Sequence, residues 1–165
     1  MILPLETPVR RPASHKNIFP LRQVMWRFKE VEDAPALLKN DLTIRMPEDL
    51  HTKFRFLFDG FTTERFVVFI LDSKNTVQAI EIVSEGTLNS SLVHPREVFR
   101  AAVAGLGAAI IVAHNHPSGN PEPSREDIEI TRQLVEAGKI LGIPIHDHIV
   151  FGRNCYTSFA ERGML

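Results

Sequence analysis

The chain has a single cysteine, Cys155, among its 165 residues. One thiol excludes an internal disulfide, and it also excludes the cysteine-rich sites that hold structural zinc. No apolar run is long enough to cross a membrane, and Pro4 and Pro8 interrupt the apolar start of the chain, so no secretory leader is visible. These absences predict a cytoplasmic protein without a membrane partner.

The net charge is also small, at −1, and requires no polyanionic partner. With 44% hydrophobic residues the chain can bury one core without disulfides, and we expect residues 18–165 to form one domain. Residues 1–17 are rich in proline, lack periodicity and predict a mobile basic arm. Such an arm can contact DNA phosphates, although short basic tails are more often just solvated.

The chemistry-bearing part of the chain is a pair of histidines at the end of a short apolar run. Residues 108–113 predict a buried strand, and His114 and His116 follow at its end. Side chains two apart in an extended chain face the same way, so both imidazoles can approach one ion. Residues 117–123 are dense in turn formers and predict a loop.

A helix is expected to begin near Ser124 and to continue to Gly142, which places Asp127 in its first turn. Ser124-x-x-Asp127 fits a helix cap, and taken alone that is the commoner use of such a pair. With the histidines just upstream, Asp127 becomes a third metal ligand, while Ser124 can still cap. Three protein ligands are typical of a catalytic zinc site, in which water takes the fourth position.

These residues carry a family resemblance. His-x-His-Pro, six residues and then Ser-x-x-Asp resembles the JAMM motif of the JAB/MPN metallo-isopeptidases, and several separate blocks resemble its RadC branch over about residues 56–165. The blocks are Gly86–Asn89, Val93–Phe99, His114–Gly119, Pro123–Asp127 and Asp147-His148. The resemblance implies an α+β domain of the cytidine-deaminase-like JAB/MPN fold, with a curved mixed β-sheet flanked by helices. It also implies Zn²⁺ held by His114, His116 and Asp127.

The resemblance further implies a general base and an oxyanion donor. It places the base at Glu64, ahead of an apolar strand, while Glu81 and Glu85 remain alternatives upstream of the histidines. Bound zinc lowers the pKa of its water to about 7, and a nearby carboxylate can pass the proton to a leaving amine. In the family Ser124 would donate a hydrogen bond to the oxyanion. The implied reaction is hydrolysis of a peptide or isopeptide bond in an unidentified protein or peptide.

A second polar cluster, His146-Asp147-His148, lies in an apolar stretch that predicts a short strand. Alternation puts His146 and His148 on one face and Asp147 on the other. Asp147 or His148 could support a ligand histidine through a hydrogen bond, as metal sites usually require. Either could equally belong to a buried polar network between strand and helix.

Two functions from different classes follow. The first is a zinc-dependent metalloprotease or isopeptidase built on Glu64, Ser124 and the three ligands. The second is a DNA-associated, DNA-repair-related accessory protein in which the metal is structural or vestigial. Longer RadC proteins carry helix-hairpin-helix modules upstream, and this chain has no room for one, which weakens the second. Nothing in the sequence identifies the substrate or an oligomer.

Overall fold

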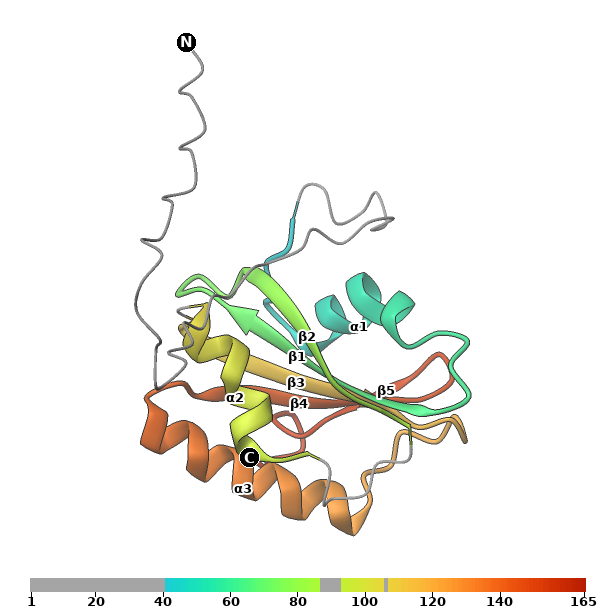
Figure 1. Cartoon of the computed structure of the whole chain (residues 1–165). Helices are drawn as coiled ribbons and strands as arrows, with labels where there is room; N and C mark the ends of the chain where they lie inside the picture. Colours follow the sequence, from blue (N-terminus) through green and yellow to red (C-terminus); the bar gives the residue numbers. More distant parts are fainter. Residues whose placement is uncertain (1–40, 87–92, 106) are drawn as a thin grey trace, which may run out of the picture.

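The computed structural model describes residues 41–86, 93–105 and 107–165, which form three layers around one mixed sheet (Figure 1). The sheet order is β2-β1-β3-β4-β5. Its strands are β1 (Glu64–Leu71), β2 (Val77–Gly86), β3 (Ala109–Asn115), β4 (Ile145–Phe151) and β5 (Tyr156–Ser158). Within this sheet β3 and β4 run parallel, and the other neighbouring pairs are antiparallel. The arm expected over residues 1–17 lies outside the described residues.

Helices cover both faces of the sheet, as Figure 1 shows. Helix α1 (Pro47–Phe54) and the short 3-10 turn η2 (Arg55–Leu57) cover one face, and their apolar side chains join a core with β1, β3 and β4. Helices α2 (Pro95–Ala104) and α3 (Arg125–Leu141) cover the other face and enclose a second core. The expected α+β fold, a mixed sheet flanked by helices, is confirmed.

Strand β3 runs through the middle of the sheet, and all seven of its residues are buried. Side chains of a strand alternate between the two faces of the sheet. Val112 therefore packs in the core beneath α2 and α3, whereas Ala113 packs in the core beneath α1. The same alternation brings His114 to the side of α2 and α3, and Asn115 to the side of α1.

Helix α3 connects the parallel strands β3 and β4, as a parallel pair requires. The N-terminus of α3 lies near the end of β3 that carries the histidines, since Asp127 in its first turn contacts both His114 and His116. Ile130 and Leu134 are buried and hold the helix against the sheet. The helix thus delivers its first-turn residues to the end of the central strand. None of the helices that the structure describes is both long and apolar enough to span a membrane.

Candidate metal centre

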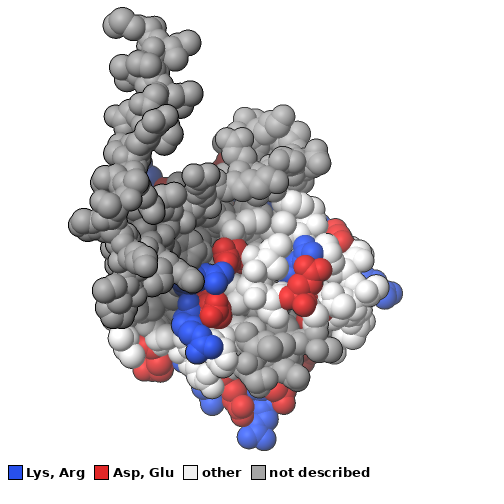
Figure 2. Space-filling view, in the orientation of Figure 1, with Lys and Arg blue, Asp and Glu red and all other residues white. Residues whose placement is uncertain are grey.

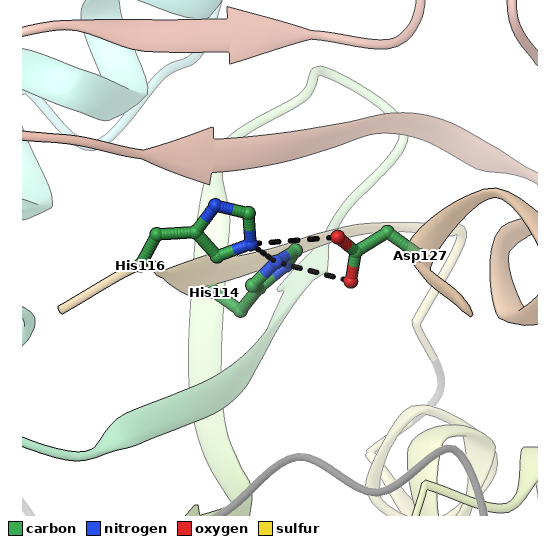
Figure 3. A group of neighbouring side chains, drawn as sticks. All are labelled: His114, His116 and Asp127. Carbon is green, nitrogen blue, oxygen red and sulfur yellow. Dashed lines mark hydrogen bonds and ion pairs between the residues drawn. The ribbon is translucent and has the colours of Figure 1, made fainter. Parts of the chain in front are cut away.

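Three side chains from two elements converge at the end of β3 (Figure 3). His114 is the sixth residue of β3, His116 follows directly after the strand, and Asp127 lies in the first turn of α3. The Nε2 atoms of His114 and His116 are 3.0 Å apart. Asp127 places Oδ1 at 3.2 Å from Nε2 of His114, and Oδ2 at 3.4 Å from Nε2 of His116.

The three side chains lie close enough to share one ion. Ligand atoms that lie 2.0–2.1 Å from a tetrahedral zinc are roughly 3.3 Å from one another. The closest contacts among His114, His116 and Asp127 span 3.0 to 3.4 Å, although the two histidines approach different oxygens of Asp127, and one ligand atom from each residue lies within 4.8 Å of the others. Two imidazoles and a carboxylate are also the ligand types that zinc takes in catalytic sites. His114, His116 and Asp127 therefore form a site that could hold a metal ion.

A hydrogen bond behind His116 orients its ring toward this site. Its Nδ1 lies 2.8 Å from the carbonyl oxygen of Asn120. A carbonyl only accepts, so Nδ1 carries the proton and the lone pair of a neutral His116 ring is on Nε2, facing the cluster. The hydrogen bond with Asp127 raises the pKa of His116, since a proton on Nε2 would be shared with the carboxylate.

The loop that supplies the Asn120 carbonyl is fixed by two glycines. Gly119 has a φ of 82°, a left-handed conformation that side chains rarely adopt. The carbonyl oxygen of Gly119 accepts a hydrogen bond from the backbone of Arg153 at 2.9 Å. A Cβ on Gly152 would lie 2.5 Å from that oxygen. Only a residue without a side chain at position 152 allows this close approach.

Asp127 serves the helix and the cluster together, as the capping pattern predicts. The backbone N–H and the hydroxyl of Ser124 each donate to Oδ2 of Asp127 at 2.7 Å, and the Ser124 oxygen accepts from the Asp127 N–H. Burial alone would raise the pKa of Asp127. The hydrogen bonds with His114, His116 and Ser124 outweigh it and hold the pKa well below its usual range. The carboxylate is therefore ionised and ready to bind a cation.

Asp147 and His148 lie on opposite faces of β4, as alternation predicts, and His148 lies directly behind His114. The expectation that His146 shares the face of His148 is wrong: the pairing of β3 and β4 shifts register between Ile110 and Ile111, and His146 lines a pocket together with Asp147. Nε2 of His148 is 2.9 Å from Nδ1 of His114, and Nδ1 of His148 is 2.6 Å from the hydroxyl of Thr131 on α3. His148 is fully buried, and this burial, followed by the charge of His114, lowers its pKa well below the usual value. Sequence reasoning missed Thr131, which lies four residues after Asp127 and therefore on the same helix face.

Asp147 is on the opposite face and does not contact the three ligand candidates. Its carboxylate accepts hydrogen bonds from the Ser158 hydroxyl at 2.6 Å and from the backbone N–H groups of His148 and Ala160. Asp147 thus anchors the turn after β5, in a buried polar network that joins two strands and not, as expected, a strand and a helix. Burial raises the pKa of this carboxyl group despite those three donors.

Glu64 begins β1, next to the histidines. Phe66 pairs with His114 across the antiparallel strands, so the same register places Glu64 across from His116, on the sheet face of His114. Asn115 holds this end of β1 in place: its Oδ1 accepts from the backbone N–H of Arg65 at 2.9 Å, and its Nδ2 donates to the Thr63 carbonyl at 3.1 Å. The hydrogen bond with Asp127 is the largest cause of the raised pKa of His116, and the negative charge of Glu64 is a smaller cause that acts in the same direction.

The other two candidate bases lie on β2, one strand further from the histidines, because β1 separates β2 from β3. Glu81 forms an ion pair with Arg100 on α2. Glu85 forms one with Arg65 at 2.9 Å. Both carboxylates are thus bound to a guanidinium group away from the cluster.

A groove of about 150 Å³ lies beside His116. Its walls are the residues after β3, the segment after η2 and the segment after β4, and they include two guanidinium side chains, Arg55 and Arg153. Asp59 partly offsets their charge through an ion pair with Arg55 at 2.9 Å. A peptide lying in this groove would pass next to His116 and thus next to the three ligand candidates.

Comparison with known proteins gives one consistent family. The model of a RadC-like JAB domain matches residues 44–164. A UPF0758 protein of Symbiobacterium thermophilum is 60% identical over 102 residues, which are 62% of this chain and 44% of the relative. Another, of Geobacter sulfurreducens, is 50% identical over 119 residues, covering 72% of this chain and 52% of the relative. A third, of Clostridium beijerinckii, is 41% identical over 149 residues, covering 90% and 63%.

The chain spans about half the length of these curated relatives, from 44% to 63%. The match with the domain model nonetheless includes every strand and helix described above, and all three ligand candidates. The resemblance drawn from the His-x-His and Ser-x-x-Asp motifs is confirmed: the chain belongs to the RadC family and carries its JAB domain.

Proposed function

We propose that this protein is a zinc-dependent metallohydrolase that cleaves peptide or isopeptide bonds. The observation that carries the proposal is the convergence of His114, His116 and Asp127, whose ligand atoms lie within 4.8 Å of one another, with Glu64 on the adjacent strand and the same sheet face. A structural site would use a fourth protein ligand. In the described residues the cluster has three, which leaves a position for water.

A zinc ion held by these three residues would supply a water of lowered pKa and would polarise the carbonyl under attack. Glu64 acts as the general base: it takes the proton from the attacking water and delivers it to the leaving amine. Its place across from His116 supports this role, and Asn115 keeps its backbone there. Glu81 and Glu85 are less suited, because Glu81 is paired with Arg100 on α2 and Glu85 is paired with Arg65 on β1.

Ser124 is proposed as the donor to the oxyanion that forms on the substrate carbonyl. In the resting structure its hydroxyl donates to Oδ2 of Asp127. The role therefore requires the hydroxyl to rotate toward the substrate. Asp127 would keep the backbone N–H of Ser124, which donates to the same oxygen at 2.7 Å. The helix cap thus survives the rotation.

The DNA-associated alternative depends on basic residues before position 30, which lie outside the described residues. Figure 2 shows one face of the described part, where lysine and arginine side chains lie beside acidic ones. Among the described residues, Arg65 forms an ion pair with Glu85, and Arg100 forms one with Glu81. Such neutralised pairs attract phosphates weakly. On the described residues, the hydrolase is the better supported function.

The first test is zinc content, measured by elemental analysis of the purified protein and of His116→Ala and Asp127→Ala. We expect about one zinc per chain in the wild type and a loss in both variants. Glu64→Gln is the matched control, because it removes the base and leaves the three ligands. Metal absent from the wild type, or retained in both ligand variants, would contradict the proposal.

The second test is hydrolysis. Zinc-loaded wild type and Glu64→Gln are incubated with two synthetic libraries, one of ordinary peptides and one in which a glycine carboxyl is joined to a lysine side chain. New termini are read by mass spectrometry in ¹⁸O-labelled water. We expect labelled products of the wild type that Glu64→Gln, with its full zinc content, does not form. Equal product formation by both proteins would remove Glu64 as the base.

A further inference from the structure

A threonine hydroxyl in the interior of α3 joins two of the ligand residues from behind. The oxygen of Thr131 is 2.5 Å from the carbonyl oxygen of Asp127 and 2.6 Å from Nδ1 of His148. Two oxygens this close need a proton between them, and a carbonyl can only accept. The single hydroxyl proton is therefore donated to Asp127. With its proton committed, the Thr131 oxygen accepts a hydrogen bond from Nδ1–H of His148.

The direction of this hydrogen bond fixes which ring nitrogen carries the proton on His148, and through His148 also on His114. A neutral imidazole has one N–H, so when His148 carries it on Nδ1, its Nε2 has the lone pair. That Nε2 is 2.9 Å from Nδ1 of His114, and the contact needs a donor on the His114 side. His114 thus has its proton on Nδ1. When the ring is neutral, its lone pair is on Nε2, the atom that faces Asp127 and His116.

We propose that Thr131, acting through His148, sets the tautomer of His114 and thereby the metal affinity of the site. The inference rests on the metal site of the proposed function. Thr131 and His148 are positioning residues: they form a chain that starts at the backbone of one ligand residue, Asp127, and ends on the ring of another, His114. The direction of every hydrogen bond in the chain follows from one hydroxyl proton.

The opposite direction would block the site. If His148 carried its proton on Nε2, it would donate to Nδ1 of His114, and His114 would hold its own proton on Nε2, where a metal must bind. The surroundings offer His148 little else to bind, since it packs between the rings of Phe159, at 4.7 Å, and Phe66, at 5.6 Å. His148, Thr131 and His114 are each at most 1% exposed. The Thr131 oxygen is therefore the acceptor that selects the productive tautomer.

The test compares Thr131→Val, which keeps the shape and removes the hydroxyl, with Thr131→Ser, which keeps the hydroxyl. Zn²⁺ affinity is measured by competition with a chromophoric chelator, after circular dichroism has shown that each variant is folded. We expect Thr131→Val to bind Zn²⁺ about 10- to 100-fold more weakly, as for other losses of a hydrogen bond behind a ligand histidine. Thr131→Ser should stay within a few-fold of the wild type. Thr157→Val removes another buried hydroxyl, one that is bonded to Arg162 and not to a residue of the cluster, and should leave the affinity unchanged.

A second readout needs no metal. Long-range ¹H–¹⁵N NMR correlations report which ring nitrogen of each histidine carries the proton. In the metal-free wild type we expect Nδ1–H on both His114 and His148, and in Thr131→Val a population with the proton of His114 on Nε2. Equal Zn²⁺ affinity of the wild type and Thr131→Val, or equal weakening by the valine and serine variants, would overturn the inference. So would a His114 ring without a proton on Nδ1 in the wild type. A wild type that binds no Zn²⁺ but shows the expected tautomers would refute the proposed function and leave the hydrogen-bond chain in place.

Discussion

The side chain of Asn115 forms hydrogen bonds with the residues directly before and after Glu64. Its amide accepts from the N–H of Arg65 and donates to the carbonyl of Thr63, so the residues before and after Glu64 are tied to β3. Because Asn115 points to the opposite face from His114, one strand supplies a ligand on one side and a support for the neighbouring strand on the other. The asparagine between the two histidines thus has a structural task of its own.

We predict that Asn115→Ala destabilises the protein and loosens the start of β1. It leaves the Arg65 N–H without its partner, which should lower the free energy of unfolding by about 1–3 kcal/mol. Urea denaturation measures this loss. The backbone amide hydrogen of Arg65 should also exchange with solvent faster than in the wild type. Zn²⁺ affinity should stay near that of the wild type, because no ligand bonds to Asn115. The control is Gln78→Ala, which removes an exposed amide and should change stability by less than about 0.5 kcal/mol.

The raised pKa of Asp147 predicts a pH dependence of stability. An acid whose pKa is higher in the folded state binds its proton more tightly there, so its contribution is fully present below the unfolded value of about 3.9. It declines as the pH rises through the folded pKa. Asp147→Asn cannot ionise, so its unfolding free energy minus that of the wild type should increase from about pH 4 upward and then level off. Denaturation curves at pH 3.5 to about 7.5 measure this difference.

The matched control for that experiment is Asp72, whose pKa is shifted in the opposite direction. Backbone hydrogen bonds from Thr76 and Lys74 lower the pKa of Asp72. Ionised Asp72 therefore stabilises the fold above the unfolded value and loses this contribution as the pH falls through the folded pKa. Relative to the wild type, Asp72→Asn should lose stability as the pH rises from acid. If the unfolding free energy relative to the wild type changed with pH in the same direction for both variants, burial would not be the cause of the pKa shift of Asp147.

Zinc removal should lower the thermal stability of the wild type. A ligand that binds only the folded state adds about 2.7 kcal/mol when its free concentration is 100 times Kd. Calorimetry with Zn²⁺ and with excess chelator measures the difference. Asp127→Asn keeps an oxygen for the Ser124 N–H and removes the charge that binds a cation, so its melting temperature should respond little to zinc. A full zinc response in that variant would remove Asp127 as a ligand.

Gly152→Ala should disturb the His116 loop. Its Cβ would lie 2.5 Å from the Gly119 carbonyl oxygen, so the loop must shift, at a cost of about 1–3 kcal/mol. The shift moves the Asn120 carbonyl that orients His116, and Zn²⁺ affinity should fall with stability. Gly60→Ala is the control: its φ of 81° also strains a side chain, but nothing lies within 4 Å of the added carbon. It should lose stability without a loss of Zn²⁺ affinity.

Local patterns were sufficient for the parts of the site that are close in sequence. His114 and His116 could be placed together because they are two apart at a strand end, and Asp127 because a cap with Ser124 fixes the start of the helix. Helix α3 begins at Arg125 and ends at Leu141, as the cap and Gly142 predict. The mixed sheet with flanking helices followed from the family resemblance.

The remaining relationships depend on which strands are neighbours, and sequence alone does not contain that information. Glu64 could be ranked above Glu81 and Glu85 only by resemblance, because the order β2-β1-β3 decides which strand lies beside the histidines. His148 reaches His114 through the parallel pairing of β3 and β4, and Thr131 joins them from a helix. The catalytic role of Glu64 stays a prediction.

The alternation along β3 has a consequence for how this domain tolerates insertions and deletions. Removing one residue within Ala109–Asn115 would turn every later side chain to the other face, so the histidine and asparagine positions would exchange surroundings at once. A length change in the loop between His116 and Ser124 would act on only one end of the cluster. Gains and losses of residues should therefore be absent from the strand, and they should be tolerated in the loop only where the Asn120 carbonyl still reaches His116.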